Sequence, residues 1–167
     1  MVEVAVAHLG IDRTSHTPVV LLREKVGTRV LPIWIGPAEA SAIAMELQGV
    51  KAQRPMTHDL LKQLLLGLGG ELRRVQITAV RENTYFAELL VHRDGELFVV
   101  DARPSDSIAL ALRVRAPIFT SDDLLDEPGP RSPDAPTSAP DPSGLDPDRL
   151  KAELERMDPQ DLGKFTP

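Results

Sequence analysis

Hydrophobic and polar positions along the chain follow two periods, which predict strands and helices respectively. Alternation or short β-branched apolar runs indicate seven strands. We predict them over 2–9, 18–24, 28–35, 72–79, 84–92, 96–102 and 117–121. The turn at 24–27 joins the second and third strands as a hairpin, and Asp94-Gly95 is a hairpin signal between the fifth and sixth.

Three segments have the helical period and helix end signals. The first covers about 37–48, with Pro37 at its first position, Glu39 in its first turn and Gly49 after its end. The second follows Thr57 as N-cap and stops at Gly69-Gly70. Its leucines form a wide apolar face made of Leu60, Leu61, Leu64, Leu65 and Leu68. The third runs from Pro104 to about Arg113.

This order of elements predicts an α+β fold: a mixed, largely antiparallel sheet with covering helices in a single compact domain. We assign residues 1–127 to that domain. Nine of the fifteen prolines fall at or after Pro128, so 128–145 is predicted to be a Pro-rich disordered linker. Residues 146–167 are predicted to hold a short acidic helix and tail.

The charge divides in the same way. Residues 1–121 carry 14 Lys and Arg against 13 Asp and Glu, whereas 122–167 carry 5 against 12. The near-neutral domain lacks the broad basic face of a protein that grips long duplex DNA, so nucleic acid would bind through a local patch. The absence of a long apolar run and of a basic leader predicts a cytoplasmic protein without a membrane partner.

The chain has no cysteine, and its four histidines show no metal-ligand spacing. Disulfides, thiolate zinc sites, iron–sulfur clusters and cysteine nucleophiles are therefore excluded. A metal would be a hard, oxygen-ligated ion such as Mg²⁺ or Mn²⁺.

A repeated pattern places Arg-Pro ahead of a helix that begins with an acid, first around Arg54 and again around Arg103. A helix N-terminus offers free N–H groups and a positive dipole, and a guanidinium beside it is suited to phosphate. The alternative is structural, because Pro and Asp favour helix starts and each Arg can pair with a nearby carboxylate. Spacing alone favours this structural interpretation.

Acid–base and metal chemistry have few candidates. Asp101 ends a strand and Asp106 opens the next helix, so two carboxylates at one sheet edge could hold a divalent ion. In the alternative, structural interpretation, Asp106 only compensates the helix dipole and Asp101 pairs with an Arg. His58 is the best candidate for a general base. The alternative is that it is a first-turn residue with a structural role. Glu39 is a further acid facing the same region, or simply a helix-start acid.

Several long segments together resemble the bifunctional nuclease domain family, in the family's order. They are LPIWIGPAEASAIAMELQGV, RPMTHDLLKQLLLGLGG, TYFAELLV and DARPSDSIALALRVRAPIF. The resemblance covers about residues 1–127 and implies a self-associating α+β domain active on RNA and DNA, assisted by Mg²⁺. The family's signature polar positions fall on Glu39, Arg54, Thr57, His58, Asp59, Asp101, Arg103, Ser105 and Asp106.

We therefore predict a metal-assisted phosphodiesterase acting on nucleic acid and forming a homo-oligomer, dimer or trimer. Its predicted catalytic residues are His58, Asp59, Asp101 and Asp106. Arg54, Arg103 and Ser105 would bind phosphate, and Asp101, Asp106 and Glu39 would hold Mg²⁺ or Mn²⁺. The alternative is a non-enzymatic oligomeric module in which an Arg–Asp network fixes the loops.

Overall fold

A computed structural model describes residues 1–13 and 15–126 of the protein. The predicted linker at 128–145 and the predicted C-terminal helix at 146–167 lie outside the described residues.

Strands and helices alternate in blocks, as the sequence predicts. The strands are β1 (Val2–Ile11), β2 (Pro18–Glu24), β3 (Val30–Trp34), β4 (Glu71–Arg81), β5 (Thr84–Arg93), β6 (Glu96–Ala102) and β7 (Ile118–Thr120). The helices are α1 (Pro37–Leu47), α2 (Thr57–Gly67), α3 (Pro104–Val114) and α4 (Asp122–Asp126). The short α4 is an element that the sequence pattern did not predict.

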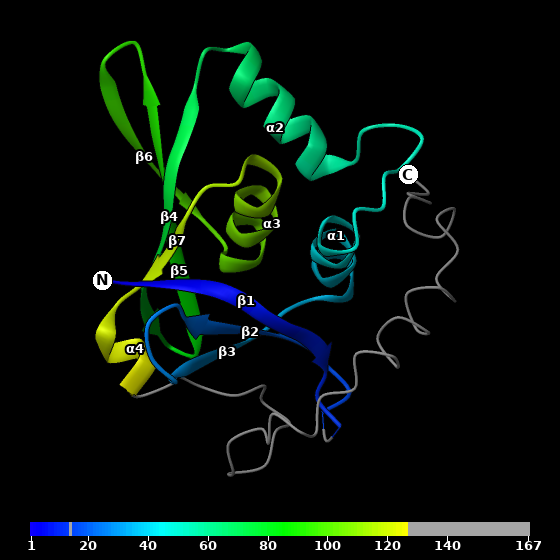
Figure 1. Ribbon diagram of the computed structural model, residues 1–167, viewed down its shortest axis with the longest axis vertical. Helices are drawn as coiled ribbons and strands as arrows, with labels where there is room; N and C mark the ends of the chain where they lie inside the picture. Colours follow the sequence, from blue (N-terminus) through cyan, green and yellow to red (C-terminus); the bar gives the residue numbers. More distant parts are fainter. Residues whose placement is uncertain (14, 127–167) are drawn as a thin grey trace.

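The strands form one seven-stranded sheet in the order β3-β2-β1-β7-β4-β5-β6. Every pairing is antiparallel except that of β4 with β7, which confirms the predicted mixed, largely antiparallel α+β fold. The short β7 joins the two antiparallel meanders, β1–β3 and β4–β6, into one sheet (Figure 1). Strands β3 and β6 are consequently its two edges, with backbone groups that no neighbouring strand of this sheet pairs.

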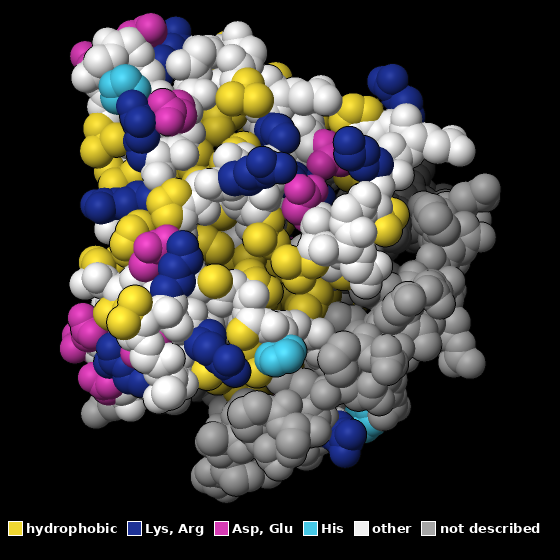
Figure 2. Space-filling view, viewed as in Figure 1, with side chains coloured by type: hydrophobic (Ala, Val, Ile, Leu, Met, Phe, Trp, Pro, Cys, Tyr) yellow, Lys and Arg dark blue, Asp and Glu magenta, His cyan; other side chains and the backbone are white. Residues whose placement is uncertain are grey.

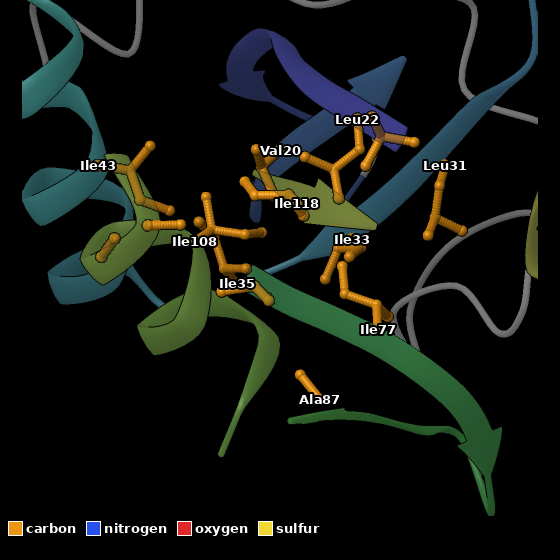
Figure 3. Packing of buried hydrophobic residues seen from close by; sticks show 14 of the residues in the cluster. Val20, Leu22, Leu31, Ile33, Ile35, Ile43, Ile77, Ala87, Ile108 and Ile118 are labelled. Carbon is orange, nitrogen blue, oxygen red and sulfur yellow. The ribbon is translucent and has the colours of Figure 1, made fainter. Parts of the chain in front are cut away.

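The core lies between the sheet and helices α1 and α3. Side chains from β2, β3, β4, β7, α1 and α3 interdigitate there (Figure 3). Ile43 of α1, Ile77 of β4 and Ile108 of α3 are fully buried within it. Helix α3 is central, because it packs against α1, α2, β4 and β5. Its place therefore fixes where the residues at its N-terminus lie.

Helix α2 begins at Thr57, so its N-cap is Met56 and our prediction of Thr57 as N-cap was wrong by one residue. Asp59, the third residue of the helix, accepts a hydrogen bond from the Met56 backbone N–H at 3.0 Å. A first-turn carboxylate that turns back in this way satisfies a free N–H and makes a Thr cap unnecessary. No helix among the described residues is long and apolar enough to span a membrane.

The helix α2 and the edge strand β6 leave many large apolar side chains exposed. We call these side chains together the apolar face: Leu60, Leu61, Leu64, Leu66 and Leu68 of and after α2 and Leu97, Phe98, Val99 and Val100 of β6. Those of β6 alternate between the two faces of the sheet. Hydrophobic side chains are visible over much of the region between α2 and the β4–β6 meander (Figure 2). An apolar surface of this extent is typical of an interaction site.

A cluster around Arg29 fastens α4 to the β2–β3 hairpin. The guanidinium donates to Glu24 Oε2 at 2.7 Å, to Asp126 Oδ1 at 2.7 Å and to Asp122 Oδ1 at 3.1 Å. These hydrogen bonds, the largest from Asp126, raise the pKa of Arg29 above its already high ordinary value. The cluster is structural and lies among acids, so it offers no free cation for a phosphate.

Candidate functional site

A line of four charged and polar side chains joins the N-terminal ends of α1, α2 and α3. Arg103, the N-cap residue of α3, donates from Nε to Asp106 Oδ2 at 2.8 Å and contacts Glu39 Oε1 of α1 through Nη2 at 2.8 Å. Asp106 Oδ1 in turn lies 3.0 Å from Nε2 of His58, the second residue of α2. We call Glu39, Arg103, Asp106 and His58 the Arg103 cluster.

Local sequence accounts for each of these positions. Pro104 occupies the first position of α3, where its fixed φ and missing N–H cost nothing, so Arg103 is held in extended backbone at the helix start. Asp106 and Glu39 stand in the first turns of their helices, where carboxylates suit the dipole. The Glu39 carboxylate folds back over Gly36, and an added Cβ at Gly36 would collide with it.

A second network also joins α2 to α3, at the last turn of α3. Arg113, from the last turn of α3, is buried and donates from Nε to Asp59 Oδ1 at 2.7 Å and from Nη1 to the Ala109 carbonyl at 2.9 Å. Lys62 of α2 donates to the Arg113 carbonyl at 2.8 Å. Because Asp59 also caps α2, this network fixes the helix against α3 and thereby sets the position of His58.

Both aspartates are held in their ionised form. Burial by itself would raise the pKa of Asp106, but hydrogen bonds from Arg103 and His58 outweigh it and the pKa lies below its ordinary value. Burial likewise opposes ionisation of Asp59, and hydrogen bonds from Arg113 and the Met56 N–H again lower the pKa. An ionised Asp106 next to Nε2 favours the tautomer with its proton on Nε2, leaving Nδ1 of His58 as an acceptor.

A cavity of about 250 Å³ opens beside the Arg103 cluster, and we call it the edge pocket. It lies where the end of β3, the β4–β5 turn and the N-terminus of α3 meet. Its lining residues are Ile33, Trp34, Ile35, Gly36, Glu39, Asn83, Thr84, Tyr85, Arg103, Pro104 and Ser105. Arg103 and Glu39 thus belong both to the cluster and to the wall of a cavity that admits a small molecule.

The structure brings together most of the polar residues that the sequence singled out. Glu39, His58, Arg103 and Asp106 form the Arg103 cluster, and Ser105 lies beside them in the pocket wall. Asp59 is next to His58 but belongs to the second network with Arg113.

Two of the predicted residues lie elsewhere. Asp101 is opposite Glu88 in the β5–β6 pairing, one residue after Val100, whose partner Leu89 packs in the core beneath α3. Because side chains alternate along a strand, Asp101 points to the sheet face away from Asp106. Arg54 is exposed in the loop before α2, and no ion pair involving it is found within 1–13 and 15–126. Asp101 and Asp106 therefore lie toward different faces of the sheet, and the predicted catalytic and metal-binding role of Asp101 stays a prediction.

The residues predicted to hold Mg²⁺ or Mn²⁺ do not fit such an ion. Both oxygens of Asp106 are engaged by His58 and Arg103, and Glu39 shares the same guanidinium. In the described part of the chain, no group of three or more His, Asp and Glu side chains is arranged to hold a metal. A hard cation needs several oxygen ligands converging on one point, and here a guanidinium occupies that point.

Sequence reasoning missed Arg113, Lys62 and the turn residue Asn83. A signal for Arg113 was present, since it follows Asp106 by seven residues and Ala109 by four and so lies on the same buried face of α3. A charged residue on a buried face predicts a partner. Asn83 offered no such signal, because only the folded sheet brings the β4–β5 turn to the end of β3.

Comparison with known proteins agrees with this arrangement. The family model described as the bifunctional nuclease domain matches residues 20–132, which include every residue of the Arg103 cluster. The chain belongs to the bifunctional nuclease domain family. The resemblance that the sequence motifs indicated is thereby confirmed.

Individual members of the family extend the comparison. An uncharacterized protein of Mycobacterium tuberculosis is 46% identical over 134 residues, which is 80% of each chain. Bifunctional nuclease 2 of Oryza sativa is 29% identical over 154 residues, and Bifunctional nuclease 1 of Arabidopsis thaliana is 30% identical over 110. The match covers 90% and 64% of this chain but only 47% and 34% of the two plant proteins.

Proposed function

We propose that the protein is a nuclease that hydrolyses phosphodiester bonds of RNA and DNA at the Arg103 cluster. The observation that carries this proposal is the hydrogen-bonded line from Glu39 through Arg103 and Asp106 to His58 in a bifunctional nuclease domain. Two members of that line, Glu39 and Arg103, also line a pocket. A phosphodiester needs a cation for its oxygens and a group that moves a proton, and both types of group are present here.

Arg103 is the group suited to the phosphate. Its side chain is 67% exposed although it contacts two carboxylates. A guanidinium has five N–H donors, and only two of its nitrogens make these contacts, so donors remain for phosphate oxygens. Ser105 and the first N–H groups of α3 lie next to it and support the same role.

His58 is the group suited to proton transfer. With Nε2 held by the ionised Asp106, its Nδ1 can accept a proton from water as the water oxygen bonds to phosphorus. The bond from phosphorus to the leaving sugar oxygen then breaks, and His58 returns the proton to that oxygen. Asp106 orients the ring and stabilises its protonated form without itself becoming protonated.

Cleavage of RNA, single-stranded DNA and duplex DNA by the purified full chain tests this proposal. We expect His58→Gln and Arg103→Gln each to lower the rate about 10²-fold or more, the size usual for a lost acid–base group or a lost transition-state donor. His8→Gln and Arg93→Gln are matched controls. Both residues are exposed, and Arg93 pairs with Asp94 rather than with a member of the cluster. Equal rates for parent and His58→Gln would contradict the proposal and assign the cleavage to a contaminant.

The predicted use of Mg²⁺ is tested in the same assay by adding EDTA and by measuring Asp101→Asn. Cleavage that survives EDTA and the Asp101 substitution supports chemistry by the Arg103 cluster alone. Cleavage abolished by both would contradict it and support a metal site that includes Asp101.

A specific observation also favours the second function, that of an oligomeric module. Arg103 and Arg113 each pair with carboxylates that hold helix ends together, and the apolar face is exposed in a single copy of the chain. We infer that a second copy covers this face. The unpaired backbone groups of an edge strand can hydrogen-bond to another strand. In a two-fold dimer that strand would be β6 of the second copy, which carries apolar side chains on both faces.

Sedimentation of Val99→Glu tests self-association, with Val26→Glu as the matched control. Val99 lies on β6 and is 59% exposed, whereas Val26 lies in the β2–β3 turn and is 92% exposed. The Val99 substitution is expected to shift the protein to single copies and the Val26 substitution to leave its assembly unchanged. A parent chain that sediments as a single copy at all concentrations would contradict the inference.

A further inference from the structure

The edge pocket has features that the proposed phosphodiester chemistry does not require. The proposed chemistry uses only Arg103, Glu39 and Ser105 of the pocket lining, and His58 does not line the pocket. Its remaining walls come from the end of β3 and from the β4–β5 turn, and they combine apolar side chains with polar groups. These walls therefore indicate what part of a substrate the pocket receives.

The first polar feature is the free backbone edge of β3. The Ile35 N–H bonds to the Pro18 carbonyl of β2, so backbone groups of alternate residues point toward β2. Trp34 is the neighbour of Ile35 along the chain, so its N–H and C=O point away from β2. The Pro32 carbonyl, two residues earlier, shares this direction and lies 3.5 Å from the Tyr85 hydroxyl of β5. Trp34 thus presents one donor and one acceptor toward the β4–β5 turn.

The second polar feature comes from side chains. Asn83 lines the pocket with an amide that both donates and accepts, and its backbone has a φ of 63° that Asn tolerates. Ser105 also lines the pocket, and its residue as a whole is 7% exposed. Its hydroxyl oxygen is not among the buried unpartnered atoms of the described residues, so it is open to solvent and can hydrogen-bond a ligand.

The walls between these polar groups are apolar. Ile33, Ile35, Tyr85 and Pro104 provide them. At about 250 Å³ the cavity is smaller than the about 300–1,000 Å³ of pockets for drug-sized ligands, so it admits one small ring system and no base pair. Apolar side chains with a backbone donor and acceptor at one side are suited to a nucleobase, which has apolar faces and a hydrogen-bonding edge.

We propose that the edge pocket receives one unpaired nucleobase of a single-stranded RNA or DNA, while the adjoining phosphate binds Arg103. This inference rests on the proposed nuclease function and narrows its substrate class. A base in a duplex is stacked and paired, and it must leave the helix at a cost of a few kcal/mol before it can enter such a pocket. Single strands and loops are therefore the favoured substrates.

Calorimetry measures binding at the pocket directly. We expect adenosine or uridine monophosphate to give a heat of binding. Inorganic phosphate at the same concentrations should have a much smaller effect. Equal effects of phosphate and nucleotide, or no heat with either nucleotide, would overturn the proposal.

Two substitutions locate the binding. Thr84→Tyr places a bulky ring at the pocket wall and is expected to weaken nucleotide binding at least about tenfold. Asn83→Gly removes the amide but keeps the positive φ, and the loss of one hydrogen bond corresponds to binding about threefold to tenfold weaker. Thr28→Tyr, in the exposed turn at the other end of β3, is the control and should bind like the parent. Equal binding by parent and Thr84→Tyr would overturn the proposal.

Cleavage assays separate a failure of this inference from a failure of the nuclease proposal. A protein that cleaves in a His58-dependent manner, yet acts equally on single strands and duplex, would be a nuclease without this base pocket. Nucleotide binding that Thr84→Tyr abolishes, in a protein that cleaves nothing, would support the pocket and contradict the nuclease proposal.

Discussion

Helices α2 and α3 begin from similar sequences and have opposite environments. Each has eleven residues and carries Asp at its third position. An Arg-Pro pair precedes α2 by one residue, and at α3 the Pro of the pair is the first helical residue. Eight residues of α3 are buried, whereas His58 alone is buried in α2. The signals that start each helix are local, so both segments become helices. The burial of their side chains depends on neighbouring elements. Helix α3 packs against the sheet and against α1 and α2, whereas α2 contacts mainly α3.

This difference assigns separate tasks to the two helices. Helix α3 is held on all sides, so Arg103 and Asp106 at its start have a fixed position, as a site requires. Helix α2 contributes His58 and Asp59 through its first turn and leaves its leucines on the apolar face. The Arg103 cluster is therefore anchored by α3, while most leucines of α2 stay exposed.

The largest expected effect is on the packing of α3. Ile108→Ala removes a fully buried side chain and should lower the free energy of unfolding by about 2–5 kcal/mol. Leu64→Ala in α2, where the side chain is 52% exposed, should change it by less than about 0.5 kcal/mol in dilute protein. Urea unfolding measures the free energy of unfolding of both variants. An equal decrease in the two would show that the leucines of α2 are covered even in a single copy.

A smaller effect is expected where the two helices are joined. Arg113→Leu leaves the half-buried Asp59 Oδ1 without its guanidinium donor and should cost about 1–3 kcal/mol. Arg93→Leu is the control, since Arg93 pairs only with the exposed Asp94 and should cost less than about 0.5 kcal/mol. If Arg113→Leu were as stable as the control, α2 would be held by other contacts than this network.

The smallest effect is on the pH dependence of stability. The pKa values of Asp59 and Asp106 are lowered in the folded protein, so both carboxylates contribute stability above their unfolded pKa of about 3.9. That contribution is lost as the pH falls from about 5 through the folded values. Asp59→Asn and Asp106→Asn should each show a shallower acid decrease in Tm than the parent. A decrease as steep as the parent's in both variants would contradict the assignment of these pKa shifts.

The course of the chain was predictable because its signals are local. Period-two alternation, the Asp94-Gly95 turn and Pro at the first positions of α1 and α3 place seven strands and three helices close to their observed positions. The N-cap of α2 was misplaced by one residue because Asp59 caps it by turning back, an interaction that spacing alone does not distinguish from a Thr cap.

The candidate site was only partly predictable. Arg103, Asp106 and Glu39 are helix-start residues and were recognisable as such, but their convergence depends on α1 and α3 packing side by side. The face that Asp101 takes was not predictable, because strand-end position does not tell which sheet face a side chain takes, and here the pairing with β5 turns it away. Arg113 was overlooked although its helical spacing places it on the buried face.

The sequence by itself determined the elements, the α+β class and the family, because these depend on periodicity, turn chemistry and long matching motifs. Only the tertiary structure decided that Glu39, Arg103, Asp106 and His58 form one cluster, that the β4–β5 turn closes a pocket at the end of β3, and that α2 and β6 remain uncovered. The physical reason is that contacts between residues far apart in the chain depend on how the sheet orders its strands, which local pattern does not specify.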